Sequence, residues 1–272
     1  HPVLKGEKKC AFAQTEPDAG GDPGGMRSTA VRDGNHYIIN GNKRFITGAD
    51  KADFFQLQAA TDRSKGSRGG ISTFLIDAGT PGLELVRYQQ MMMDDRPWEI
   101  SMQDVRVPVE NMIGEEGEGF HYLLDGLNAE RILIAAESIG IGRAALRRAV
   151  QYANDRVVFD RPIGKNQGIA FPLAEARMKL DAADLMTKKA AWLIDNGQRC
   201  GAEANMAKWL AAEAGFFAAD AAIQTHGGFG YAREYHVERY WREARLMKLA
   251  PISQEMILNF VSEHVLGLPR SY

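Results

Sequence analysis

The sequence predicts an α+β protein, in which an antiparallel β barrel or sandwich precedes an antiparallel four-helix bundle. Two observations carry this prediction. Up to about residue 114, short runs of alternating apolar and polar residues are separated by Gly, Asp and Pro, which is the pattern of half-buried strands. From residue 119 the apolar residues recur at spacings of three, four and seven, which is the pattern of amphipathic helices. We therefore divide the chain into residues 1–113 and residues 114–272.

The β part is predicted strand by strand. Its clearest unit is residues 37–47, where Asn40-Gly41 suits the positive φ angles of a type I′ turn, so we expect a hairpin there. Further strands are expected at residues 54–61, 70–76, 83–87 and 99–107. Because no helical pattern intervenes, these strands should form one barrel or sandwich.

The helical part contains three long helices and two short ones. The first long helix begins at residue 119, and the other two cover residues 173–194 and 206–221. The short helices lie near residues 237–249 and 253–265. Long helices with short connections form antiparallel bundles. Residues 140–145 match G-x-G-x-x-A, but no strand precedes them, so we interpret this match as small-residue packing between helices rather than a nucleotide site.

The composition excludes several classes of protein. The 272 residues include 45% hydrophobic and 25% charged residues and carry a formal net charge of -2, which is typical of a globular protein and disfavours a nucleic-acid partner. Cys10 and Cys200 form no C-x-x-C pair and indicate reduced thiols. No apolar stretch is long enough to span a bilayer and no signal peptide is visible. We expect a soluble protein of the cytosol or of an organelle, without a membrane partner.

Three segments contain residues that suit ligand binding, although each alone also fits a surface loop. Residues 12–22 end in a Gly-rich turn, where bare backbone can approach a ligand. Residues 156–167 gather Arg, Lys and Gln near Phe159. Residues 224–230 contain three glycines; one explains a helix C-cap, and the others indicate close packing or phosphate binding. The His and Cys spacing predicts no metal site.

In combination these segments resemble the acyl-CoA dehydrogenase family, flavoenzymes with an N-terminal helical domain, a middle β domain and a C-terminal four-helix bundle. The matching motifs run in family order along essentially the whole chain: T-E-P-x-A-G-x-D from Thr15, I-N-G-x-K-x-x-I-T-G from Ile39, V-R-V-P from Val105, E-G-x-G-F from Glu116, R-x-x-F-x-x-x-I from Arg156, Q-x-x-G-G-x-G from Gln224 and Arg242-Glu243-Ala244. The resemblance implies that the N-terminal helical domain is absent from these residues, in keeping with a start at His1.

The resemblance implies FAD as the cofactor, with its isoalloxazine ring between the β domain and the bundle. On the β domain, the residues that match flavin contacts are Phe12, Gln14, Thr15, Gly20 and Gly21, with Phe45, Ile46 and Thr47 on the second strand of the hairpin. Arg156, Val158, Phe159, Asn166 and Gln167 match positions that hold the FAD diphosphate and adenosine of a neighbouring subunit. Gln224, Gly227 and Gly228 match the loop that meets the same cofactor from the other chain, and Ser253 and Glu255 match polar FAD contacts. Shared FAD sites imply a homodimer or homotetramer.

The implied reaction belongs to fatty acid metabolism: FAD-dependent α,β-dehydrogenation of an acyl-CoA thioester to the trans-2-enoyl-CoA, with electrons passed to an electron-transfer flavoprotein. A carboxylate removes the α-proton, the β-hydride passes to the flavin, and hydrogen bonds to the thioester oxygen stabilise the developing enolate. The resemblance leaves the length and branching of the acyl chain open.

The position of the base departs from the commonest family pattern. Aligning Arg242-Glu243-Ala244-Arg245 with the family's R-D-A-K places the usual loop Glu at Pro251, which has no carboxylate. A minority of members, including isovaleryl-CoA and long-chain acyl-CoA dehydrogenases, carry the Glu on the first bundle helix, just before an Arg. Residues 128–131, Asn-Ala-Glu-Arg, match that pattern. Glu130 is therefore the expected base, and Asn128 and Arg131 match positions close to the CoA moiety.

Two further departures bear on the site. Pro251 also lacks the N–H that the family's loop residue donates to the thioester oxygen. Either the loop register shifts by one, so that Ile252 supplies the donor, or the oxyanion hole is weakened; Glu255 would be the base only in a very different register. Gly21 stands where many members have Ser, near the pantetheine. Two alternatives stay open: a catalytically incomplete or partner-dependent subunit, and a DNA-associated flavoprotein relative.

Overall fold

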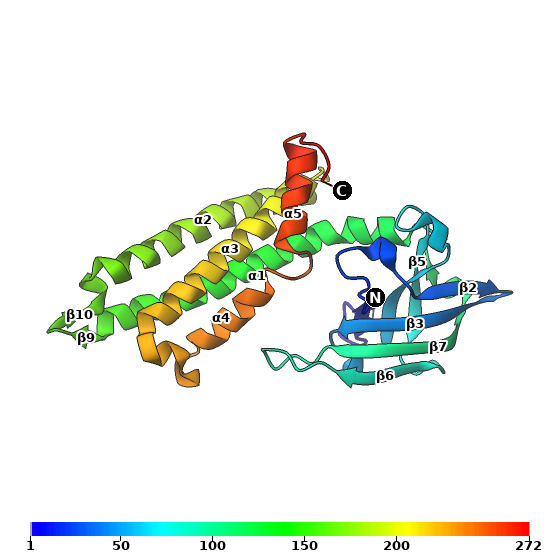
Figure 1. Ribbon diagram of the computed structural model, residues 1–272, viewed down its shortest axis with the longest axis horizontal. Coiled ribbons are helices and arrows are strands. Elements are labelled where there is room, and N and C mark those ends of the chain that lie inside the picture. Colours follow the sequence, from blue (N-terminus) through cyan, green and yellow to red (C-terminus); the bar gives the residue numbers. More distant parts are fainter. Residues whose placement is uncertain (1, 272) are drawn as a thin grey trace. The chain divides into compact units, whose positions relative to one another are not determined.

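The computed structural model describes residues 2–271, which divide into two compact units, one up to Asp125 and one from Gly126 on. The first unit is a mostly antiparallel β sheet and the second is helical (Figure 1). The predicted fold class is therefore confirmed. The division falls inside the first long helix, because the first residues of that helix pack on the sheet: Gln58 Nε2 donates to Gly119 O at 3.4 Å.

One eight-stranded sheet makes up most of the first unit, in the order β6-β7-β3-β2-β4-β5-β8, with β1 paired to β4. The strands are β1 (Cys10–Ala13), β2 (Thr29–Asp33), β3 (His36–Ile46), β4 (Phe54–Ala60), β5 (Ile71–Asp77), β6 (Leu83–Tyr88), β7 (Trp98–Pro108) and β8 (Met112–Ile113). Successive side chains of a strand point to opposite faces of the sheet, so every second one points into the core. Tyr37, Ile39, Phe55 and Phe74 share this core.

The hairpin predicted at Asn40-Gly41 is wrong. Strand β3 runs unbroken through these residues, with a shift in its register to β7 between Ile39 and Gly41. The turn lies earlier, between β2 and β3, where Gly34 has a φ of +59°. A Cβ atom on Gly41 would collide with Ser28, so this glycine allows two strands to approach closely rather than turning the chain.

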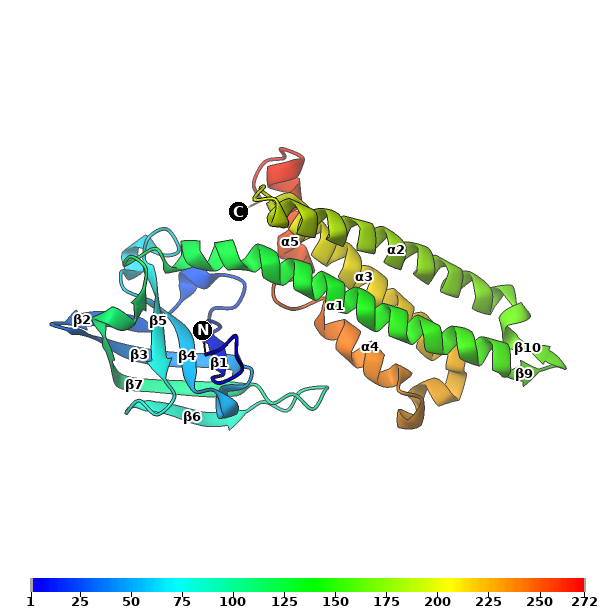
Figure 2. The same cartoon turned by 180° about the vertical axis from the view of Figure 1, so that it is seen from behind.

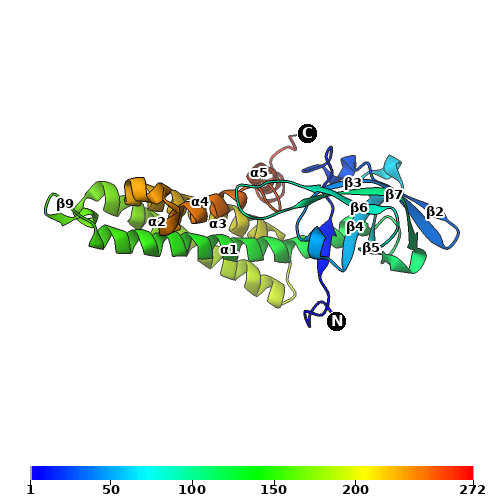
Figure 3. The same cartoon turned by 90° about the horizontal axis from the view of Figure 1, so that it is seen from below.

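All five predicted helices are present. They are α1 (Gly119–Asp155), α2 (Gln167–Asp195), α3 (Gly201–His226), α4 (Val237–Leu246) and α5 (Gln254–Phe260), followed by one π turn (Val261–Val265). The long helices run along one another (Figure 2 and Figure 3) around a core rich in alanine. Within residues 2–271, no helix combines the length and the apolar character that crossing a membrane requires.

Small residues bring α1 and α3 into close contact. A Cβ atom on Gly142 would lie 2.9 Å from Gly215 Cα and 2.7 Å from Leu180 Cδ2, closer than side chains pack. The interpretation of residues 140–145 as a helix-packing motif therefore holds at Gly142. Between α1 and α2 the chain forms a short hairpin of β9 (Val157–Val158) and β10 (Arg161–Pro162).

Candidate active site

A buried ion pair holds the first β segment against β3. Lys43 Nζ lies 2.8 Å from Glu16 Oε1 and 3.0 Å from the carbonyl oxygen of Gln14, and both charged side chains are buried. Burial lowers the pKa of Lys43 to about 8, while the Glu16 carboxylate opposes that shift. Although burial pushes the pKa of Glu16 upward, the charge of Lys43 and several hydrogen bonds hold it below its ordinary value. The backbone N–H of Arg44 donates to Thr15 O at 2.8 Å, so Gln14 and Thr15 are fixed beside the end of β3.

Two aromatic side chains close in sequence to the ion pair, one on β1 and one on β3, are exposed. Phe12 on β1 is 42% exposed and Phe45 near the end of β3 is 50% exposed. Phe45 has a φ of +60°, an uncommon conformation for a bulky residue that costs free energy and often marks a functional position. Gly20, Gly21 and Thr47 are exposed as well, whereas the side chain of Ile46 is buried in the core, so only its backbone remains available to a ligand.

The helical unit contains a cavity of about 600 Å³ where α1, the β9–β10 hairpin and the end of α3 meet. It brings together the predicted residues Arg156, Val158, Gln224, Gly227 and Gly228, within one chain. No atom lies within 4 Å of where a Cβ on Gly227 or Gly228 would be, so both backbones are open to the cavity. A Cβ on Gly230 would collide with Ile223 O; this third glycine serves packing.

Charge and aromatic surface accompany this cavity. Within residues 2–271, no ion pair involves Arg156, whose side chain is exposed. His226 stacks on Tyr152 with ring centroids 4.3 Å apart, and burial lowers its pKa, so the ring is neutral near pH 7. An unpaired guanidinium beside open backbone suits a phosphate group.

The tip of the β9–β10 hairpin is strained. Phe159 and Asp160 form the turn with φ angles of +53° and +60°, a conformation that usually takes Gly or Asn, and Phe159 is 92% exposed. Asn166 holds the hairpin in place: its Oδ1 accepts from Arg161 at 2.8 Å and its Nδ2 donates to Ile163 O at 3.0 Å. Its side chain is therefore occupied within the chain, whereas Gln167 is exposed.

Glu130, the predicted base, lies on α1 beside a buried arginine. Its side chain is exposed overall, but partial burial raises the pKa of Glu130 above its ordinary value, against the opposing charge of Arg131. Arg131 is 8% exposed and donates to Asn128 Oδ1 at 2.9 Å. Asn128 thus orients Arg131, and the charge of Arg131 acts on Glu130.

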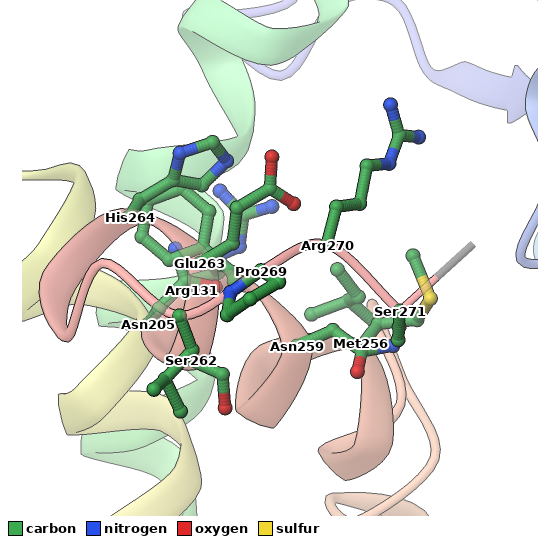
Figure 4. A pocket seen from close by; sticks show the side chains of 13 residues that line it. Arg131, Asn205, Met256, Asn259, Ser262, Glu263, His264, Pro269, Arg270 and Ser271 are labelled. Atoms are coloured by element: carbon green, nitrogen blue, oxygen red, sulfur yellow. The ribbon is translucent and has the colours of Figure 1, made fainter.

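Arg131 also lines a second cavity, of about 350 Å³ (Figure 4). Its lining comes from α1, α3, the loop before α5, α5 itself and the residues after α5, and it includes Arg131, Asn205 and Ile252. Among the described residues, neither Arg131 Nε nor Asn205 Oδ1 has a hydrogen-bond partner, although both atoms are buried. The cavity therefore contains a buried donor and a buried acceptor near the loop that precedes α5.

The loop before α5 leaves two N–H groups free. The N–H groups of Leu249 and Ala250 donate to Leu246 O at 2.8 and 3.1 Å, and Pro251 has none. Within residues 2–271, neither Ile252 nor Ser253 donates its N–H to any acceptor. The hydroxyl of Ser253 accepts from Met256 N at 3.3 Å and caps α5, so this predicted FAD contact has a structural role, and Glu255 is exposed.

Sequence reasoning missed the lysine that contacts this loop. Lys208 on α3 is fully buried, and its Nζ donates to Ile252 O at 2.7 Å and to Gln254 Oε1 at 3.1 Å. The available signal is its position, since Lys208 falls four residues from both Ala204 and Ala212 on the apolar face of the helix. A lysine on such a face needs a specific partner.

Comparison with known proteins identifies the family. A family model of the acyl-CoA dehydrogenase middle domain matches residues 11–105, and one of the acyl-CoA dehydrogenase C-terminal domain matches residues 117–266. Together they cover both units of the structure.

Individual proteins agree with this match. Acyl-CoA dehydrogenase FadE12 of Mycobacterium tuberculosis is 42% identical, over 99% of this chain and 70% of the relative. The caffeyl-CoA reductase-Etf complex subunit CarC of Acetobacterium woodii is also 42% identical, over 91% of this chain and 66% of its own length. The structure of butyryl-CoA dehydrogenase from Megasphaera elsdenii superposes with a TM-score of 0.94 at 37% identity, covering 97% of this chain and 70% of that one. The resemblance drawn from the motifs is confirmed: the chain belongs to the acyl-CoA dehydrogenase family of oxidoreductases.

Proposed function

We propose that this chain catalyses FAD-dependent α,β-dehydrogenation of an acyl-CoA thioester to the trans-2-enoyl-CoA, with Glu130 as the base. One observation carries the proposal: a carboxylate with a raised pKa lies on α1 directly before a buried arginine, while the usual loop position holds Pro251. A base that removes the weakly acidic α-proton needs a raised pKa, because a strongly acidic carboxyl group is too weak a base.

The residues present fit FAD in two places. On the β domain, residues 1–113, the flavin would meet the exposed Phe12 and Phe45 and the segment from Gln14 to Gly21. On the bundle, residues 114–272, the diphosphate would meet Arg156 and the open backbones of Gly227 and Gly228, and the exposed ring of Phe159 would stack on the adenine. When bound, FAD supplies the hydride acceptor of the reaction.

Ile252 is the proposed oxyanion donor. The thioester oxygen gains negative charge as the α-proton leaves. Enzymes commonly stabilise such an oxygen with hydrogen bonds from free backbone N–H groups. Pro251 cannot donate, Leu249 and Ala250 are occupied, and the N–H of Ile252 is free. This supports the one-residue shift in register over a weakened oxyanion hole.

An assembly of identical chains is part of the proposal. Phe171, Met178, Leu185 and Trp192 recur every seven residues on α2 and are all more than half exposed, which is the spacing of a helix that packs on another helix. A homodimer or homotetramer would cover this stripe. The name of the Acetobacterium woodii relative, a subunit of an Etf complex, supports an electron-transfer flavoprotein as the electron acceptor.

Substrate-dependent bleaching tests the function. The purified protein should bind FAD, and anaerobic addition of straight and branched acyl-CoA thioesters should bleach the flavin while an enoyl-CoA, lighter by two hydrogens, forms. The panel identifies the acyl group. Absence of bleaching with every thioester would contradict the proposal; if a second protein chain then restored bleaching, the partner-dependent alternative would replace it.

A further inference from the structure

Hydrogen bonds from Lys208 and Gln254 tie the loop before α5 to α3. Lys208 Nζ binds the carbonyl oxygen of Ile252 and the side chain of Gln254. Gln254 Nε2 donates in turn to Trp209 O at 3.2 Å and to Glu213 Oε1 at 3.1 Å. Glu213 also pairs with Lys248 at 2.8 Å, near the end of α4. The end of the loop that leads into α5 is therefore fastened to α3 by Lys208 and Gln254. Among the described residues, Lys248 hydrogen-bonds only to Glu213 and not to the loop.

Burial of Lys208 is hard to explain by stability alone. Its side chain has no exposed surface, and removing an ammonium group from water costs free energy that its hydrogen bonds only partly recover. An apolar residue of the same length would fill this space at lower cost. What the ammonium adds is a fixed loop backbone. Bonded to Ile252 O, it holds the residue whose free N–H is the proposed oxyanion donor, and it polarises the next peptide, which carries the free N–H of Ser253.

We propose that Lys208 is a positioning residue, whose ammonium fixes the Ile252–Ser253 peptide so that the loop's free N–H groups face the thioester oxygen of the acyl-CoA. This inference rests on the proposed function. Lys208 itself touches neither substrate nor flavin in this account. It acts through the backbone carbonyl of Ile252, which every substitution at that position would retain. The contact is therefore tested by changing Lys208.

The charges around Lys208 come from three helices and from the segment after α4. Glu213 on α3 and Glu255 on α5 favour its charged form, whereas Arg131 on α1 and Lys248 beside α4 disfavour it. Burial is the largest influence and lowers the pKa of Lys208 to about 8. The ammonium is thus charged at neutral pH, and its charge is lost as the pH rises through 8.

A bound enolate reports directly on this arrangement. A 3-ketoacyl-CoA binds as a substrate analogue, and the acidity of its α-proton measures how strongly the site stabilises the thioester enolate. Titration of the FAD-loaded enzyme, followed by enolate absorbance, gives the pKa of the bound ligand. Lys208→Met keeps the length of the side chain but removes its charge and donors. We expect the pKa of the ligand to rise by about one unit, a tenfold loss of enolate stabilisation. Flavin reduction by substrate should slow about 10- to 100-fold, with little change in KM, because a lost oxyanion donor itself costs about 10²- to 10³-fold.

Lys248→Met is the matched control, since it removes an ammonium from the same network without touching the Ile252–Ser253 peptide. It should leave the pKa of the ligand at its wild-type value. If Lys208→Met does not retain FAD, Lys208→Gln takes its place, because the amide keeps one donor without the charge. An unchanged ligand pKa in a folded Lys208 variant, or an equal shift in Lys248→Met, would overturn the proposal. A wild type that shifts the ligand pKa but is not bleached by any acyl-CoA would contradict the proposed function instead.

Discussion

Lys43 and Lys208 play parallel parts in the two units. Each is fully buried, and each donates to a carbonyl oxygen of a segment that we propose contacts the ligand, Gln14 in one case and Ile252 in the other. Backbone that must hold a fixed shape at a ligand cannot satisfy all its polar groups within regular secondary structure. A buried ammonium supplies the missing donor at a cost that neighbouring carboxylates reduce.

Removal of the ammonium at Lys43 should destabilise the β unit strongly. Lys43→Met leaves the Glu16 carboxylate buried without its counter-ion, and loss of one partner of such a pair costs about 3–5 kcal/mol. Denaturant unfolding measures this loss. The double variant Lys43→Met, Glu16→Gln should recover much of it, because neither charge is then buried alone. A loss for Lys43→Met as small as that of an exposed ion pair would contradict this account.

The pH dependence of substrate reduction should reveal Glu130. A base is active only when deprotonated, so activity falls as the pH drops through its pKa. Partial burial raises the pKa of Glu130 above its ordinary value of 4.5. The acid limb of kcat/KM is therefore expected above pH 4.5, at the pKa of the free enzyme. An acid limb at or below that value would show that another group titrates.

The sequence motifs predicted which residues lie close together better than what each side chain does there. Arg156, Gln224 and Gly228 do line one cavity. Asn166 instead uses its side chain to hold the β9–β10 hairpin, and the hydroxyl of Ser253 caps α5. A motif records residue types at a spacing, whereas a hydrogen bond such as that between Lys208 and Ile252 joins residues 44 positions apart, which only the fold reveals.

Among the elements, periodicity predicted helices more reliably than turn chemistry predicted turns. The apolar stripes of α1, α2 and α3 are long enough to average over exceptions. The turn prediction rested on only two residues, Asn40 and Gly41. A glycine is equally suited to a turn and to a place where two strands approach closely, so this signal is ambiguous. The contact of Gly41 with Ser28 decides between them, and it depends on strand pairing that the local sequence does not specify.

The β9–β10 hairpin should bind FAD through its exposed tip. Because Phe159 is 92% exposed, Phe159→Ala removes little packing and should leave thermal unfolding of the FAD-free protein unchanged. Loss of ring stacking should weaken FAD affinity by about 1–3 kcal/mol, at least several-fold. Tyr231→Ala is the matched control, since Tyr231 is 88% exposed and lies outside the β9–β10 hairpin. Equal FAD affinity in both variants would exclude a role for the tip.

At the scale of the whole molecule, the exposed apolar stripe on α2 predicts association. Leu185→Glu places a charge at its middle, where the leucine is 70% exposed in the single chain. The variant should be smaller than the wild type by light scattering, because burying an unpaired carboxylate in an apolar interface is costly. Leu4→Glu, at a residue 87% exposed in the other unit, should not change the mass. A wild type that is already a monomer would contradict the proposed assembly.

The most direct test of the central claim is single-turnover reduction by wild type, Glu130→Gln and Glu137→Gln, with flavin absorbance and thioester mass followed in one anaerobic sample. Glu137 is an exposed carboxylate seven residues further along α1, so it matches Glu130 in helix and in face. Wild type and Glu137→Gln should bleach in step with enoyl-CoA formation. Glu130→Gln should retain its FAD and slow at least about 10²-fold. Enoyl-CoA formation by Glu130→Gln at the wild-type rate would contradict the account.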